Sequence, residues 1–241
     1  MNQTEYINRL IDQGRLSEAK LLLSAGTVKT ESIPELSLNL ANSFYACEQY
    51  RCAADCFAEA QKTGKLGLLA RAKLANCLLQ TNRRPVALGI LRELSGTINK
   101  LPQEALDIYL RIAVHVRDHE LIEKAERKAR LRFPNTSFYW FAGGVHAYQN
   151  ERYFQAITFF GRAVELSPLR PPYRLALARA FMKLGRQLEA IEVLDCMDLE
   201  RIDCIADIML MKIIFTEIGF DEGIENCCSE LTRRYFQKNQ A

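Results

Sequence analysis

Alanine recurs along this chain at a spacing of 34 residues, and this period constrains the fold more than any other feature. Ala19, Ala53 and Ala87 are each 34 residues apart. Ala156 follows Ala87 after two periods plus one residue, and Ala190 comes one period later. A period in this range indicates a stack of similar supersecondary units rather than one globular core. Such stacks generally present extended surfaces that hold other molecules.

The period divides the sequence into segments in which apolar residues recur at three- and four-residue steps. This spacing is typical of amphipathic helices, and each segment has room for two of them with a short turn between. One extra residue falls in the loop-like stretch 95–102. We therefore predict an all-α fold of about fourteen helices in seven antiparallel pairs, with units at about 1–33, 34–67, 68–102, 103–136, 137–170, 171–204 and 205–241.

The fifth segment shows most clearly which residue types each place requires. Small residues let two helix backbones approach, while a large side chain fills the space beside them. The large, small, alanine, aromatic, alanine and proline places are filled by Trp140, Gly144, Ala156, Phe160, Ala163 and Pro168. This pattern resembles the tetratricopeptide repeat (TPR). The resemblance implies a solenoid wound into a right-handed superhelix, in which the first helix of each unit lines a concave groove.

Three segments depart from this pattern. The first segment starts with the chain, the fourth has Ile122 at a small-residue place, and the seventh has Lys212 and Ile224 at two such places. Terminal units of a stack are often atypical. The departure of the fourth unit predicts a bend near 95–136 within a single solenoid that spans 1–241.

A second row of residues follows the same period on the first helices. Asn8, Asn42 and Asn76 occupy the ninth place of the first three units, where Arg111 stands in the fourth and Arg179 in the sixth. Asparagine is not favoured within helices, so three in register require an explanation. An amide offers a donor and an acceptor that match a peptide backbone, and the resemblance implies peptide contacts at this place. The alternative is that these amides are solvated or bond to neighbouring helices.

Asn39 and Lys73 occupy the sixth place of the second and third units. The resemblance extends here to the dicarboxylate clamp of heat-shock co-chaperones, which uses asparagine and a basic residue at these places. That clamp also requires basic residues where this chain has Thr4 and Leu69. Lys73 could still pair with a C-terminal carboxylate, but two charged contacts of the full clamp are absent.

The rear half carries mostly apolar residues at the groove places. Phe138, Phe141 and Tyr148 come from the fifth unit, and Met209 and Ile213 from the seventh. Such a lining could receive an amphipathic helix or a hydrophobic segment of a partner. Two alternatives remain open: the lining is covered within the molecule, or it forms a homodimer through the C-terminal unit, which has no obvious polar capping helix after it.

Composition excludes several classes of protein. A net charge of +3 is too balanced for a nucleic-acid-binding surface, and no apolar stretch approaches the length needed to cross a bilayer. The N-terminus has no signal-peptide pattern, so we expect a cytoplasmic protein without membrane insertion. We expect the eight cysteines to be free and to serve mainly as small buried apolar residues. The basic run of Arg127, Lys128, Arg130 and Arg132 is interpreted as a solvated outer face, with contact to an acidic partner as the alternative.

No residue pattern indicates catalysis. His115 and His119 are four residues apart, but the repeat places them on two successive helices, which is not the geometry of a metal site. Gly143 and Gly144 follow a helical stretch and favour close helix packing over a phosphate loop. We predict no enzyme activity, no cofactor and no metal.

The function that this pattern predicts is a cytoplasmic scaffold or chaperone-like adaptor that binds a peptide segment of a partner protein in its concave groove. The most specific form of this prediction is a chaperone or assembly factor of a bacterial secretion or surface-appendage system. The alternative is a regulatory module that senses a peptide and controls a transcription factor or an enzyme.

Overall fold

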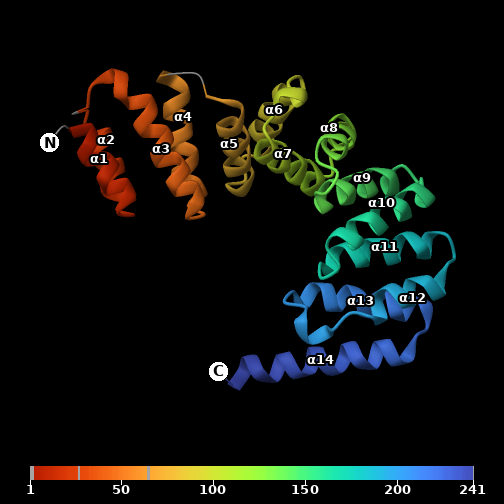
Figure 1. Cartoon of the computed structure of the whole chain (residues 1–241). Coiled ribbons are helices and arrows are strands. Elements are labelled where there is room, and N and C mark those ends of the chain that lie inside the picture. The colour runs from red at the N-terminus through yellow and green to blue at the C-terminus, as the bar shows by residue number, and fades with distance from the viewer. Residues whose placement is uncertain (1–2, 27, 64–65, 241) are drawn as a thin grey trace. The chain divides into compact units, whose positions relative to one another are not determined.

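The computed structural model describes residues 3–26, 28–63 and 66–240, and within these residues every regular element is helical (Figure 1). Among the described residues, fourteen α-helices follow one another as seven pairs, which confirms the all-α prediction. The pairs are α1 (Gln3–Asp12) and α2 (Leu16–Ser24), α3 (Ile33–Ala46) and α4 (Tyr50–Thr63), α5 (Leu68–Gln80) and α6 (Arg84–Ser95), α7 (Gln103–Val116) and α8 (His119–Arg132), α9 (Ser137–Gln149) and α10 (Tyr153–Leu166), α11 (Pro171–Lys183) and α12 (Gln187–Asp195), and α13 (Ile205–Ile218) and α14 (Asp221–Gln240).

The turn between the two helices of every pair is built in the same way. One residue of each turn has left-handed backbone geometry, and it follows the repeat spacing through Gly14, Glu48, Asn82, Arg117, Glu151, Gly185 and Gly219. The next residue donates its backbone N–H to the carbonyl five positions earlier, at 2.8 to 3.1 Å. This is the Schellman arrangement that ends helices. It fixes the sharp reversal that lets the two helices of a pair pack together.

The alanine period marks the points where helices approach most closely. All five repeated alanines have no exposed surface. Gly144 has the same role on α9, because a Cβ atom added there would lie 2.4 Å from Cδ1 of Phe160 on α10. The prediction that small residues stand at the helix crossings is therefore confirmed for these positions.

The chain divides into two compact units, residues 1–125 and 126–241. The division falls inside the range 95–136, where the sequence predicts a bend; that the chain forms one continuous solenoid stays a prediction. The first unit has an apolar core drawn from α1 to α6, which includes Leu40, Phe44 and Phe57. The second unit has its own core from α9 to α14, which includes Phe160, Phe215 and Cys227.

Arg130 of α8 corrects one interpretation of the sequence. Its guanidinium is 2.6 Å from the Glu126 carboxylate, both side chains are largely buried, and it lies 3.9 Å from the centre of the Phe159 ring. Gly143 makes room for it, because a Cβ atom there would meet the guanidinium at 2.5 Å. Arg130 therefore does not belong to a solvated basic face, although its neighbours Arg127 and Lys128 are exposed.

The last helix, α14, has twenty residues and supplies polar groups to the surface of the seventh pair. Its exposed side chains in the first turns are polar or acidic, as at Asp221, Glu222 and Glu225. Near its end, Arg234 donates to the backbone carbonyls of Leu199 and Ile202. The same helix also exposes the rings of Tyr235 and Phe236, so its surface is both polar and apolar.

Candidate functional site

The first helices of each unit share one face, which we call the first-helix face. It comprises the second, fifth, sixth, ninth, twelfth and thirteenth places of each repeat. In the first unit α1, α3, α5 and α7 contact one another in order, and in the second unit α9, α11 and α13 do so. Side chains at equivalent places of successive first helices therefore lie on the same side. All ten residues that the sequence singles out for binding occupy these places.

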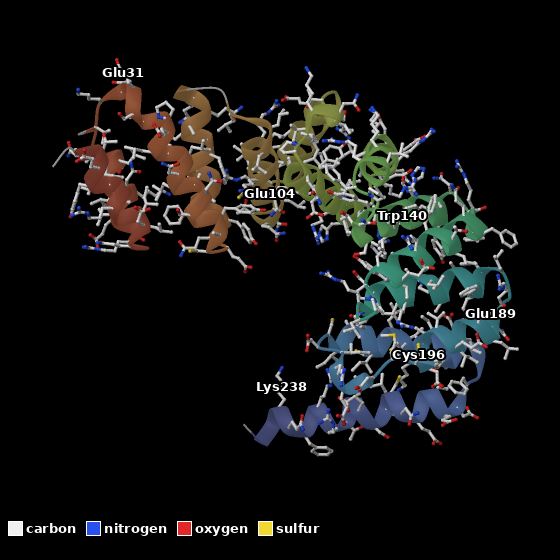
Figure 2. All side chains as sticks on the ribbon, in the orientation of Figure 1. Glu31, Glu104, Trp140, Glu189, Cys196 and Lys238 are labelled. Carbon is white, nitrogen blue, oxygen red and sulfur yellow. The ribbon has the colours of Figure 1, made fainter. Side chains whose placement is uncertain are left out.

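A ladder of polar contacts connects three first helices of the first unit. Lys73 on α5 donates through Nζ to Oδ1 of Asn42 on α3 at 3.3 Å. The same ammonium is 3.0 Å from Oε1 of Glu104, which lies in the first turn of α7 and is labelled in Figure 2. Each step spans 31 residues, and the Lys73 side chain is only 14% exposed. A ligand carboxylate at Lys73 would therefore compete with Glu104, a residue that sequence reasoning did not identify.

A second contact in the ladder involves Asn76 and Tyr45. Nδ2 of Asn76 on α5 donates to the Tyr45 hydroxyl on α3 at 2.9 Å. Burial raises the pKa of Tyr45, so its hydroxyl is protonated at neutral pH. Nδ2 of Asn42 also donates to the Leu38 carbonyl within α3 at 3.0 Å. Asn42 and Asn76 thus bond within the protein, the alternative that the sequence left open, and the ladder holds both amides in fixed orientations.

The remaining polar residues of the first unit are more accessible. Asn8 on α1 is half-buried and Asn39 on α3 is exposed. Arg111 on α7 is exposed, and its Nε donates to Oδ2 of Asp107 one turn earlier at 2.7 Å. The structure therefore brings Asn42, Lys73 and Asn76 together between α3 and α5, where the Lys73 ammonium also lies 5.5 Å from the centre of the Tyr45 ring. Asn8, Asn39 and Arg111 lie elsewhere on the same face.

The aromatic residues of the second unit are partly used in helix packing. The ring of Phe141 on α9 stacks on Tyr173 of α11, with centroids 4.8 Å apart, and lies 5.7 Å from Phe160. Tyr148 packs edge-to-face on Tyr153 at 5.3 Å. Phe138, Phe141 and Tyr148 are all half-buried. They therefore present only part of their apolar surface on the first-helix face.

The most exposed apolar surface of this face lies on α13, at Met209 and Ile213 of the fifth and ninth places, and Ile205 at the first place lies beside it. Ile205, Met209 and Ile213 are 46%, 53% and 53% exposed. They follow one another at four-residue steps and so form one stripe along the helix. Arg179, on the neighbouring helix α11, is exposed as well. Sequence reasoning placed Met209 and Ile213 on this face but did not recognise the stripe that Ile205 completes; its four-residue spacing was the available signal.

The described residues hold no group of three or more His, Cys, Asp and Glu side chains placed to bind a metal ion. His115 lies near the end of α7 and His119 begins α8, as the repeat predicts. Within the described part of the chain, no helix combines the length and apolar character needed to cross a membrane.

Comparisons with known proteins support the fold. No family model matches the sequence, and no curated protein matches it significantly. A solved tetratricopeptide repeat protein from Parabacteroides merdae is 14% identical, with a TM-score of 0.70 over 96% of this chain and 91% of that one. Pseudomonas aeruginosa PilF is 15% identical, with a TM-score of 0.64 over 88% and 98%. A mutant of MamA is 17% identical, with a TM-score of 0.56 over 68% and 89%.

At these identities the likeness concerns the fold alone. The chain is therefore a protein of the tetratricopeptide repeat fold, as the residue pattern predicts.

Proposed function

We propose that this chain is a protein-binding scaffold that holds a segment of a partner protein on its first-helix faces. The observation that carries the proposal is the stripe of Ile205, Met209 and Ile213, which leaves large apolar side chains exposed along α13. Contiguous exposed apolar surface on a folded protein generally marks an interaction site. The half-buried rings of Phe138, Phe141 and Tyr148 add partial apolar surface on the same face of the second unit.

The first unit contributes polar groups whose orientation is already fixed. Asn76 donates one amide hydrogen to Tyr45, and an asparagine amide has a second hydrogen and an acceptor oxygen. Groups held in place before binding lose less conformational entropy when a ligand arrives. We assign the backbone of a partner segment to the surface that the Asn76 amide forms together with Asn8, Asn39 and Arg111. Each such bond contributes on the order of 0.5–1.5 kcal/mol, so several must act together.

We propose binding rather than catalysis, because binding is the usual role of stacked helical repeats. A chaperone-like adaptor in a secretion or appendage assembly system is its most specific form. Identification of the bound partner will show whether the protein acts in such a system.

The asparagine row has a direct test with a matched control. Asn8, Asn42 and Asn76 are replaced together by alanine, and co-purifying proteins are identified by mass spectrometry beside those of the parent chain. Tyr45→Phe is the control, because it removes the hydrogen bond between Asn76 and Tyr45 but leaves the Asn76 amide in place. We expect the triple variant to lose partners that the control retains. Unchanged capture by a triple variant with parental helicity would rule out these amides as partner contacts.

A further inference from the structure

The exposed stripe on α13 is unusual within this protein. Among the described residues, Ile205, Met209 and Ile213 are the only exposed large apolar side chains that follow one another at four-residue steps on one helix. Leu210 of α13 and Met182 of α11 are partly buried and pack against the core of the second unit. The stripe therefore lies on a helix that is packed against the apolar core of the second unit, and not on a loop.

Two cations lie on the helix next to this stripe. Arg179 and Lys183 occupy the ninth and thirteenth places of α11, are both exposed, and make no hydrogen bond or ion pair with any described residue. Arg111, at the ninth place of α7 in the first unit, is instead paired with Asp107. The helix that carries the two cations, α11, contains no acidic residue that could pair with them, and neither does the neighbouring helix α9. Glu217, at the thirteenth place, is the acidic residue that α13 contributes to this face.

The first-helix face of the first unit has the opposite charge. Its two cations, Lys73 and Arg111, already face Glu104 and Asp107. Further carboxylates stand at the face places of α1 and α3, at Glu5, Asp12 and Glu35. A strongly acidic ligand would be repelled there and attracted to α11 and α13.

We propose that the first-helix face of the second unit binds an acidic amphipathic segment of a partner protein. Apolar side chains of the segment pack on Ile205, Met209 and Ile213, and carboxylates beside them pair with Arg179 and Lys183. The apolar contacts supply affinity, because burying apolar surface is the main favourable term in association. The charge pairs supply selectivity and a faster encounter. This inference rests on the proposed scaffold function and names the chemistry of its ligand.

The test uses the full chain and labelled synthetic peptides of about 16 residues, a length sufficient for a helix to form. One peptide has leucines at three- and four-residue steps flanked by glutamates, and its partner has lysines in place of the glutamates. Binding is followed by fluorescence anisotropy. We expect the glutamate peptide to bind at least tenfold more tightly than the lysine peptide. Its affinity should fall as salt is raised, because exposed charge pairs are screened.

Charge reversal provides the decisive comparison. The double variant Arg179→Glu and Lys183→Glu should lose at least tenfold in affinity for the glutamate peptide and gain affinity for the lysine peptide. The matched control, Arg127→Glu with Lys128→Glu, changes the net charge equally at exposed places of the second helix α8 and should bind as the parent does. Met209→Ser with Ile213→Ser should weaken both peptides. Circular dichroism confirms that each variant remains helical.

Three results would overturn the inference: equal binding of both peptides, loss of binding in the α8 control, or no effect of the α11 reversal. If neither peptide binds but a natural partner is cross-linked to α13, the acidic-ligand inference fails while the scaffold function stands. If Met209→Ser with Ile213→Ser instead abolishes self-association in sedimentation velocity, the stripe is a homodimer contact and the inference is wrong.

Discussion

Replacing Gly144 by alanine should destabilise the second unit, although alanine is the better helix former. A Cβ atom at this position would lie 2.4 and 2.5 Å from two atoms of the Phe160 ring. Carbon atoms pack at about 3.5–4.0 Å, so the ring must retreat by roughly 1 Å. Phe160 is 2% exposed and already packs against Phe141, which leaves little space for that movement.

The net effect follows from two opposed terms. Overpacking a close-packed core costs about 1–3 kcal/mol, and alanine gains about 1 kcal/mol over glycine in a helix interior. Because the ring is confined, the upper part of the first range applies, and we expect a net loss of about 1–2 kcal/mol. Gly161, the next residue after Phe160, is the control, because a Cβ atom there meets no heavy atom within 4 Å. Gly161→Ala should be stabilising by up to about 1 kcal/mol.

The assay is urea denaturation followed by circular dichroism. The urea midpoints of the parent and both variants are compared on the condition that the free energy of unfolding falls with urea at the same slope in all three. We expect the midpoints of Gly144→Ala and Gly161→Ala to move in opposite directions. A Gly144→Ala protein as stable as the parent would show that the close approach of Phe160 does not require glycine here.

Three further predictions test other parts of the structure. The hydrogen bond from Arg233, helped by the one from Arg234, lowers the pKa of Glu230 to about 2. The ionised carboxylate therefore stabilises the fold above the ordinary glutamate pKa, and this contribution is lost as the pH falls towards 2. The urea midpoint of the parent should fall more between pH 5 and pH 3 than the midpoint of Glu230→Gln. Arg130→Met should cost about 3 kcal/mol in urea denaturation, because the Glu126 carboxylate stays buried without its guanidinium, and adding Glu126→Gln should recover part of that loss. Thiol labelling of the folded protein, read by mass spectrometry, should modify the exposed Cys47, Cys196 and Cys204 and spare the buried Cys56, Cys77 and Cys227 until urea is added; rapid labelling of the buried three would contradict the cores described above.

Much of the fold can be predicted from sequence because the repeat constrains every unit in the same way. The alanine period predicts the seven helix pairs, since each small residue marks a helix crossing. The repeated left-handed turn was not recognised, although Gly14, Gly185 and Gly219 stand at its place. Glu48 and Arg117 occupy the same place in other units, and side chains that seldom adopt this geometry hide the pattern.

The candidate site is harder to predict, because its contacts depend on how neighbouring helices are offset. The period places Asn42 and Asn76 on one face, but their partners Lys73 and Tyr45 stand 31 residues away rather than 34. That offset arises from the packing of α3 against α5, which no single repeat reveals. Arg130 lies in a run of basic residues and reads as solvated; Glu126, four residues earlier, was the available sign of a paired and buried side chain.

The proposed function requires that partners bind the first helices and not the second ones. Ile213 on α13 and Leu188 on α12 offer a matched pair, because both are exposed apolar residues of the second unit, on a first and a second helix respectively. A photo-crosslinking amino acid is introduced at one position or the other, and adducts are identified by mass spectrometry. Partner adducts from position 213 that are absent at position 188 are the predicted result. Equal adducts at both positions, or adducts at position 188 alone, would contradict the scaffold function proposed for the first-helix faces.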